Sequence, residues 1–138
     1  MTNPDETKTL TIEREMPHAP EKIWRALTQP ALIAEWLMKN DFQPVVGHKF
    51  SLRANPVPQW DGIINCEVLV LEPARRLSYT WGTMGMETLV VWTLTATQGG
   101  TLVRMEHSGF RHEANYKGAQ YGWKGFLDGL ERTLAKET

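Results

Sequence analysis

The sequence predicts an α+β domain in which a curved antiparallel sheet of about six strands surrounds a long C-terminal helix. An alternating segment near the N-terminus is followed by two short helical segments. A run of strand-like segments separated by short turns comes next, and the chain ends in one amphipathic helical pattern. The 138 residues fit a single domain, expected over residues 8–138 after a disordered tail at residues 1–7.

The first strand and the two short helices are each bounded by clear signals. Polar and apolar side chains alternate over residues 8–16, which predicts a strand. Pro20 stands where a first helical residue would be, and apolar side chains after it recur at helical spacing. Pro30 ends this helix and begins a second short one, whose apolar residues include Trp36.

Turn residues divide the middle of the chain into further strands. Two prolines at positions 56 and 58 predict a rigid loop, and Glu72-Pro73 ends a strand-like segment. A Gly-Thr-Met-Gly turn and a Gln-Gly-Gly hairpin turn separate the later segments. The expected strands cover residues 42–53, 60–71, 76–81, 87–97 and 102–110.

The C-terminal helix, expected over residues 115–138, carries an apolar face and a stripe of glycines. Gly118, Gly122, Gly125 and Gly129 are spaced four, three and four residues apart. Each glycine costs about 1 kcal/mol relative to alanine inside a helix. Two explanations stay open: close packing of the helix backbone against the sheet, or space left beside the helix for a ligand.

Composition excludes several classes of function. The formal net charge is −1 and the basic residues are scattered, which argues against a nucleic-acid-binding face. No segment approaches the roughly 18 apolar residues of a membrane span, and the polar N-terminus has no signal-peptide pattern, so a cytoplasmic location is expected. The single cysteine, Cys66, excludes an internal disulfide and is expected to be a buried, inert thiol.

The aromatic content is high for one small domain, with six Trp, three Tyr and four Phe. These side chains either fill the core densely or line a cavity for an apolar or aromatic ligand. If they converge, the candidate ligand-binding residues are Trp36, Phe42, Trp60, Tyr79, Trp81, Trp92, Met105, His107, Tyr121, Trp123 and Phe126.

His107 is the one candidate for a catalytic residue. It shares a strand face with Val103 and Met105, which places an imidazole among apolar side chains. It is either a core histidine hydrogen-bonded to a neighbour or a cavity group that orients a ligand or moves a proton. The sequence has no metal-ligand spacing, no serine-nucleophile motif and no phosphate-binding loop, so neither a metal nor a cofactor is expected.

Four segments carry a resemblance to a known family. They are PHAPEKIWRALTQPALIAEWL, LEPARRLSYTW, VVWTLTATQGGTLVRMEHSGF and GWKGFLDGLERTL. Together they resemble the Hsp90 ATPase activator homologue-like family of the START-like, Bet v 1-like (SRPBCC) superfamily, over about residues 9–135. The resemblance implies a helix-grip fold and a cavity that binds apolar small molecules. Some superfamily members are cyclases or aromatases. Eukaryotic co-chaperones of the family carry an additional N-terminal domain for chaperone binding, so the family name alone predicts no chaperone partner here.

The leading hypothesis is that an apolar or aromatic small molecule binds between the sheet and the C-terminal helix. His107 would orient it first, with Tyr121 or Asp61 as further polar groups. One alternative is a cofactor-free cyclase or hydrolase that uses His107 as a general base. Another is a co-chaperone-like interaction module, which would expose a large apolar patch outside the cavity. A weak homodimer is compatible with the sequence, which does not give the oligomeric state.

Overall fold

The structure is a computed structural model and describes residues 7–136. Apart from Thr7, the expected N-terminal tail lies outside the described residues. The helices and strands, in chain order, are β1 (Lys8–Met16), α1 (Pro20–Thr28), α2 (Pro30–Trp36), β2 (Lys39–Asn40), β3 (Lys49–Arg53), β4 (Ile63–Glu72), β5 (Arg76–Thr83), β6 (Met86–Thr97), β7 (Gly100–Phe110) and α3 (Glu113–Lys136).

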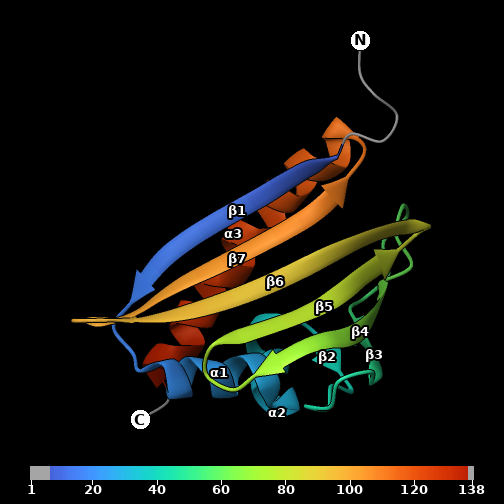
Figure 1. The fold of residues 1–138 in the computed structure, drawn as a ribbon. Coiled ribbons are helices and arrows are strands. Elements are labelled where there is room, and N and C mark those ends of the chain that lie inside the picture. The colour runs from blue at the N-terminus through green and yellow to red at the C-terminus, as the bar shows by residue number, and fades with distance from the viewer. Residues whose placement is uncertain (1–6, 137–138) are drawn as a thin grey trace.

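Over residues 7–136, seven strands form one antiparallel sheet in the order β1-β7-β6-β5-β4-β3-β2. The sheet covers one side of α3, which runs diagonally behind β1 and β7, and α1 and α2 lie near the C-terminal end of α3 (Figure 1). Consecutive hairpins connect the strands from β3 to β7. The last strand, β7, then pairs with the first strand of the sequence, β1. The α+β class, the helix-grip arrangement and the two short helices after the first strand are confirmed.

The strand expected over residues 42–53 is wrong in its first half. β3 begins only at Lys49, because the preceding residues form a loop in which Gly47 has a φ of +89°. The ring nitrogen Nε2 of His48 lies 2.9 Å from the carbonyl oxygen of Asp41, which holds the two ends of this loop together. The two-residue strand β2 was not predicted, since two residues show no periodicity.

The strand expected from residue 60 begins three positions later, at Ile63. Gly62 adopts a φ of +79°, and a Cβ there would lie 2.3 Å from the carbonyl oxygen of Ala54. Only glycine fits this close approach, so the backbone turns there before it enters β4. Trp60 therefore belongs to the loop before β4, and its side chain packs over the edge of the core.

The two halves of α3 differ in how they are held. The buried side chains of α3 begin at Trp123, and residues 113–122 contribute none. In the second half, Arg14 of β1 donates hydrogen bonds to Asp128 at 2.8 Å and to Glu131 at 2.7 Å. The first half spans the concave side of the sheet without filling it, and this arrangement positions the candidate site.

Candidate functional site

A cavity of about 460 Å³ lies between the first half of α3 and the concave side of the sheet. We call it the inner cavity. Its wall is mostly aromatic and aliphatic, and its size falls within the range of small-molecule sites. The lining residues are Met38, Trp60, Ile64, Trp81, Thr83, Met86, His107, Phe110, Ala114, Asn115, Gly118, Ala119, Gly122, Trp123 and Phe126.

Small residues keep the helix side of the inner cavity open. A Cβ built at Gly118 would meet no atom within 4 Å, and one at Gly122 would meet only the ring of Phe126 at 4.0 Å. Gly129 differs, because a Cβ there would lie 3.5 Å from the carbonyl oxygen of Trp36. Open space therefore explains Gly118 and Gly122, while Gly129 serves close packing against α2, and not against the sheet as the sequence had suggested.

Rings from the sheet and from α3 form a continuous aromatic wall. The ring centroids of Trp81 and Trp123 are 5.3 Å apart, and those of Trp123 and Phe126 are 5.6 Å apart. His107 lies 4.4 Å from the ring of Phe110 and 5.4 Å from that of Trp81. Tilted and edge-to-face contacts of this kind fix ring orientations, so the wall has a defined shape.

Hydrogen bonds determine the tautomer of His107. The indole N–H of Trp123 donates to His107 Nδ1 at 2.9 Å, so Nδ1 carries no proton. His107 Nε2 lies 2.7 Å from the hydroxyl of Thr88, which donates its own hydrogen to the carbonyl oxygen of Trp81 at 2.8 Å. The imidazole is therefore neutral, with its proton on Nε2.

The burial of His107 reinforces this neutral state. The side chain is 2% exposed, and desolvation lowers its pKa to about 4. A proton on Nδ1 would also face the N–H of Trp123, which offers no acceptor. His107 thus lines the inner cavity with a ring whose two nitrogens are both occupied by the protein.

Trp60 closes one side of the inner cavity from its loop. Its indole N–H donates to the hydroxyl of Thr83 at 2.8 Å, and Thr83 donates onward to the carbonyl oxygen of Ile63 at 2.7 Å. This short chain attaches the loop before β4 to the end of β5. The Trp60 ring is thereby held at the cavity edge.

The structure brings five of the predicted site residues together. Trp60, Trp81, His107, Trp123 and Phe126 all line the inner cavity. Five other predicted site residues pack in the core of the domain and do not line the inner cavity. They are Trp36, Phe42, Tyr79, Trp92 and Met105.

Tyr121 lies away from the inner cavity and is 86% exposed. It is two residues from Trp123, which places it on the opposite side of an α-helix. Asp61 is also exposed and does not line the inner cavity, and its carboxylate accepts a hydrogen bond from the backbone N–H of Ile63 at 3.0 Å. The two further polar groups expected to orient a ligand are thus elsewhere.

Sequence reasoning missed several lining residues. Met38, Ile64, Thr83, Phe110 and Asn115 carry no pattern that separates a cavity position from a core position. Gly118 and Gly122 had a signal, since glycine is unfavourable inside a helix unless its lack of a side chain is needed.

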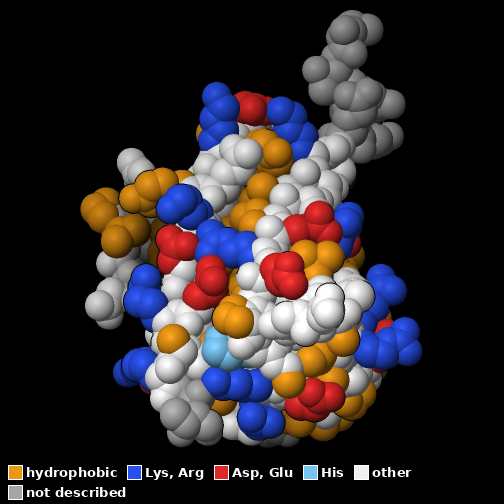
Figure 2. Space-filling model, turned by 90° about the vertical axis from the view of Figure 1, so that its left-hand side faces the viewer, with side chains coloured by type: hydrophobic (Ala, Val, Ile, Leu, Met, Phe, Trp, Pro, Cys, Tyr) orange, Lys and Arg blue, Asp and Glu red, His pale blue; other side chains and the backbone are white. Residues whose placement is uncertain are grey.

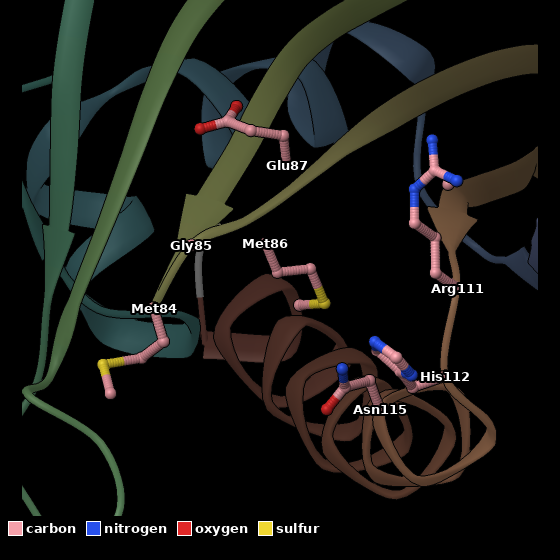
Figure 3. A pocket seen from close by; sticks show the side chains of 8 residues that line it. Met84, Gly85, Met86, Glu87, Arg111, His112 and Asn115 are labelled. Carbon is pink, nitrogen blue, oxygen red and sulfur yellow. The ribbon is translucent and has the colours of Figure 1, made fainter.

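A second, more polar hollow of about 360 Å³ adjoins the inner cavity, and we call it the outer hollow (Figure 3). It lies beyond the last pair of β6 with β7, Leu89 with Ser108. Gly109, with a φ of +99°, is the extra residue of a bulge in β7 opposite β1. Met86 and Asn115 line both hollows, so the two meet at these side chains. The lining residues are Met84, Gly85, Met86, Glu87, Gly109, Arg111, His112 and Asn115.

Other kinds of site find no support in the described part of the chain. Residues 7–136 contain no group of three or more His, Cys, Asp or Glu side chains placed to hold a metal ion. Cys66 is buried, and burial raises the pKa of its thiol to about 12. No helix among the described residues is long and apolar enough to cross a membrane.

The exposed large hydrophobic side chains come from several elements, and one of them, Met84, lines the outer hollow. The face in Figure 2 mixes acidic, basic and hydrophobic side chains. The exposed large hydrophobic residues among those described are Val45, Val46, Val57, Leu69, Met84 and Tyr121.

A family model described as Activator of Hsp90 ATPase homolog 1-like protein matches residues 17–135. No curated protein matches the chain.

Among solved structures, protein MLL2253 from Mesorhizobium loti is 47% identical, with a TM-score of 0.88 over 95% of this chain and 99% of that one. CalU16 from Micromonospora echinospora is 25% identical, with a TM-score of 0.80 over 95% of this chain and 78% of that one. DynU16, a protein in the dynemicin biosynthetic locus, is 25% identical with a TM-score of 0.81. The match to DynU16 covers 93% of this chain and 47% of that one, so this chain spans about half of DynU16.

Proposed function

This chain belongs to the Activator of Hsp90 ATPase homolog 1-like family, and we propose that it binds an apolar or aromatic small molecule in the inner cavity. The observation that carries this proposal is the combination of an aromatic wall with a glycine-lined helix. Gly118 and Gly122 together cost about 2 kcal/mol of helix stability relative to alanine, and packing does not require them. Space for a ligand explains why side chains are missing there.

The volume and the wall chemistry support one class of ligand. A cavity of about 460 Å³ accommodates a molecule of two or three fused rings. Faces and edges of Trp81, Trp123 and Phe126 would contact such a molecule, and burial of its apolar surface would supply about 25 cal/mol per Å². Binding would depend mainly on this burial.

Binding without chemistry fits the inner cavity better than catalysis does. Among its lining residues, His107 is the one side chain with an acid–base group. Its Nδ1 lone pair accepts from Trp123, and its Nε2 proton is directed at Thr88. A general base needs a free lone pair within reach of the substrate proton, and His107 does not offer one in this arrangement.

The similar structures agree with a small-molecule role. DynU16 is a protein in a biosynthetic locus, and its likeness to this chain supports a ligand that is a small organic molecule. A protein-binding role lacks comparable support, since the exposed hydrophobic side chains come from different elements.

A substitution that fills the inner cavity tests the proposal. In Gly118→Phe, the new ring has open space to enter, so the domain should fold while the cavity volume falls. We expect the unaltered chain to bind the fluorescent probe N-phenyl-1-naphthylamine and Gly118→Phe to bind it at least ten-fold more weakly, measured by fluorescence titration.

Gly125→Phe is the matched control. A Cβ at Gly125 also meets no atom within 4 Å, but this glycine is exposed and does not line the inner cavity. Its affinity for the probe should equal that of the unaltered chain. The proposal is wrong if the unaltered chain does not bind the probe, or if both variants bind it equally well.

A further inference from the structure

We propose that the ligand of the inner cavity carries a hydrogen-bond-accepting oxygen, such as a carbonyl or an ether, and that the indole N–H of Trp81 binds it. This inference rests on the proposed function and goes further, because it names a recognition group and the chemistry that it selects. Trp81 belongs to β5 and lines the inner cavity on its sheet side.

The tryptophans themselves provide the comparison. Four of the five that are buried or line the inner cavity donate the indole N–H to a protein acceptor. Trp36 donates to the carbonyl oxygen of Ala26 at 2.8 Å, Trp60 to Thr83 at 2.8 Å, Trp92 to the hydroxyl of Tyr79 at 2.9 Å and Trp123 to His107 at 2.9 Å. Trp81, the fifth, makes no such hydrogen bond within residues 7–136, although it is only 6% exposed.

A buried indole N–H without a partner is costly, so the surroundings of Trp81 matter. Within the described residues, no side-chain nitrogen or oxygen is both fully inaccessible and without a partner. The N–H of Trp81 therefore keeps accessible surface. Since Trp81 lies on the concave side of the sheet against His107 and Trp123, the inner cavity is the space that it can reach.

The other polar side chains of the inner cavity, apart from Asn115 at its opening, are already used. Both nitrogens of His107 have partners, and the N–H groups of Trp60 and Trp123 are donated to the protein. The hydroxyl of Thr83 accepts one hydrogen bond and donates another. A ligand atom deep in the inner cavity thus finds one unused side-chain donor, the N–H of Trp81.

The amide of Asn115 is the second unused polar group. It lies where the inner cavity meets the outer hollow, and it makes no side-chain hydrogen bond within the described range. Because Asn115 is exposed, water satisfies it in the absence of a ligand. It can contact a polar group near the opening, whereas Trp81 selects for an acceptor oxygen further inside.

Two probes of similar shape test this selection. 2-Acetylnaphthalene carries a carbonyl group where 2-isopropenylnaphthalene carries a C=CH₂ group, and both are neutral. Their affinities are measured by displacement of N-phenyl-1-naphthylamine. We expect the unaltered chain to bind the acetyl compound about ten-fold more tightly, because the alkene leaves the indole N–H without an acceptor.

Trp81→Phe and Trp60→Phe form a matched pair of variants. Each loses one ring of the indole and one N–H at the wall of the inner cavity, but the N–H of Trp60 is already donated to Thr83. The affinity ratio of the two probes should fall to near one in Trp81→Phe and stay near ten in Trp60→Phe. Because the ratio is compared, a general loss of affinity in either variant does not affect the result.

A spectroscopic measurement keeps the inference testable if Trp81→Phe does not fold. The carbonyl stretch of 2-acetylnaphthalene bound to the unaltered chain should lie at lower frequency than in hexane, as expected for a hydrogen-bonded carbonyl. An unshifted stretch, or equal affinities for the two probes, overturns the inference and leaves the proposed function intact. Binding of neither probe overturns both.

Discussion

At the scale of single residues, His107 shows how a titratable side chain becomes part of a rigid wall. It accepts the N–H of Trp123, and through Thr88 it is connected to the backbone of Trp81. The ring of Trp123 and the backbone of Trp81 are thus both linked to one imidazole. Its role in this arrangement is to position them, which differs from a catalytic role.

Substitution of His107 by leucine should be strongly destabilising. His107→Leu removes the acceptor of a buried indole N–H and the partner of a buried hydroxyl. Buried polar groups left without partners cost about 1–3 kcal/mol, so we expect the free energy of unfolding to fall by about 3 kcal/mol. Urea denaturation measures it, and His112→Leu, at an exposed position, should change it by less than about 0.5 kcal/mol. A loss below about 1 kcal/mol in His107→Leu would contradict the hydrogen-bonded arrangement.

The lowered pKa of His107 predicts a pH dependence of stability. Its ordinary value of 6.5 falls to about 4 in the folded protein because of burial. As the pH falls below 6.5, the unfolded chain binds the proton first, so the folded state loses stability until the pH reaches about 4. The free energy of unfolding falls by about 3 kcal/mol over this interval. Above pH 6.5 and below pH 4 the contribution of His107 does not change with pH.

His107→Gln isolates this contribution, because glutamine does not titrate. The free energy of unfolding of the unaltered chain, from urea denaturation between pH 7 and pH 4, should fall more steeply than that of the variant. Carboxylate groups contribute equally to both curves. Parallel curves would show that His107 is protonated alike in the folded and unfolded chains.

Residue spacing predicted part of the candidate site. Alternation predicted that Tyr79 and Trp81 share one face of a strand and that His107 points toward α3, and all three are buried. It could not tell that Trp81 lines the inner cavity while Tyr79 packs in the core, because that depends on where α3 crosses the strands. Tyr121 is different, since its helical offset from Trp123 already placed it on the other side of the helix.

At the scale of elements, α3 combines a fixed half with a half that spans the inner cavity. Its second half is buried from Trp123 onward and is tied to β1 by Arg14. Its first half has no buried side chain and contains Gly118 and Gly122. Helices with few buried contacts open locally at low free energy, so the two halves should differ in stability.

Hydrogen exchange of the α3 amides measures this difference. We expect amides of residues 113–122 to exchange at least ten-fold faster than those of residues 123–134. The start of α3 is held by the ion pair of Lys8 with Glu113 and by the ring contact of Phe110 with Tyr116. The amides of residues 113–122 should therefore exchange through local opening, without unfolding of the whole segment. Equal protection along the whole helix would refute the difference.

Elements with a clear period or a proline were predicted well, and short or irregular ones were not. The alternation of β1 gave both of its bounds, and the prolines gave the first residues of α1 and α2. Residues 42–48 contain as many apolar side chains as a strand, yet a loop held by Asp41 and His48 places most of them at the surface. Such tertiary contacts override local propensity and leave no signal in a single sequence.

At the scale of the whole molecule, the aromatic residues are divided between two tasks. Trp36, Trp92 and Tyr79 pack in the core, and the ring of Trp92 lies 5.7 Å from that of Trp123. Trp81 and Phe126 continue from this core to the wall of the inner cavity. The cavity is therefore an extension of the folded core, and under the proposed function a ligand there would complete the packing of the sheet against the first half of α3.

A ligand in that position should stabilise the whole domain. At one hundred times its dissociation constant, a ligand that binds only the folded chain adds about 2.7 kcal/mol to the free energy of unfolding. For a domain of this size, the melting temperature should rise by roughly 10 °C. The measurement is a thermal-shift assay with the naphthalene probes. Gly118→Phe should melt cooperatively and show no rise, because its cavity is filled, whereas Gly125→Phe should behave as the unaltered chain. A rise of equal size in Gly118→Phe would place the bound probe outside the inner cavity.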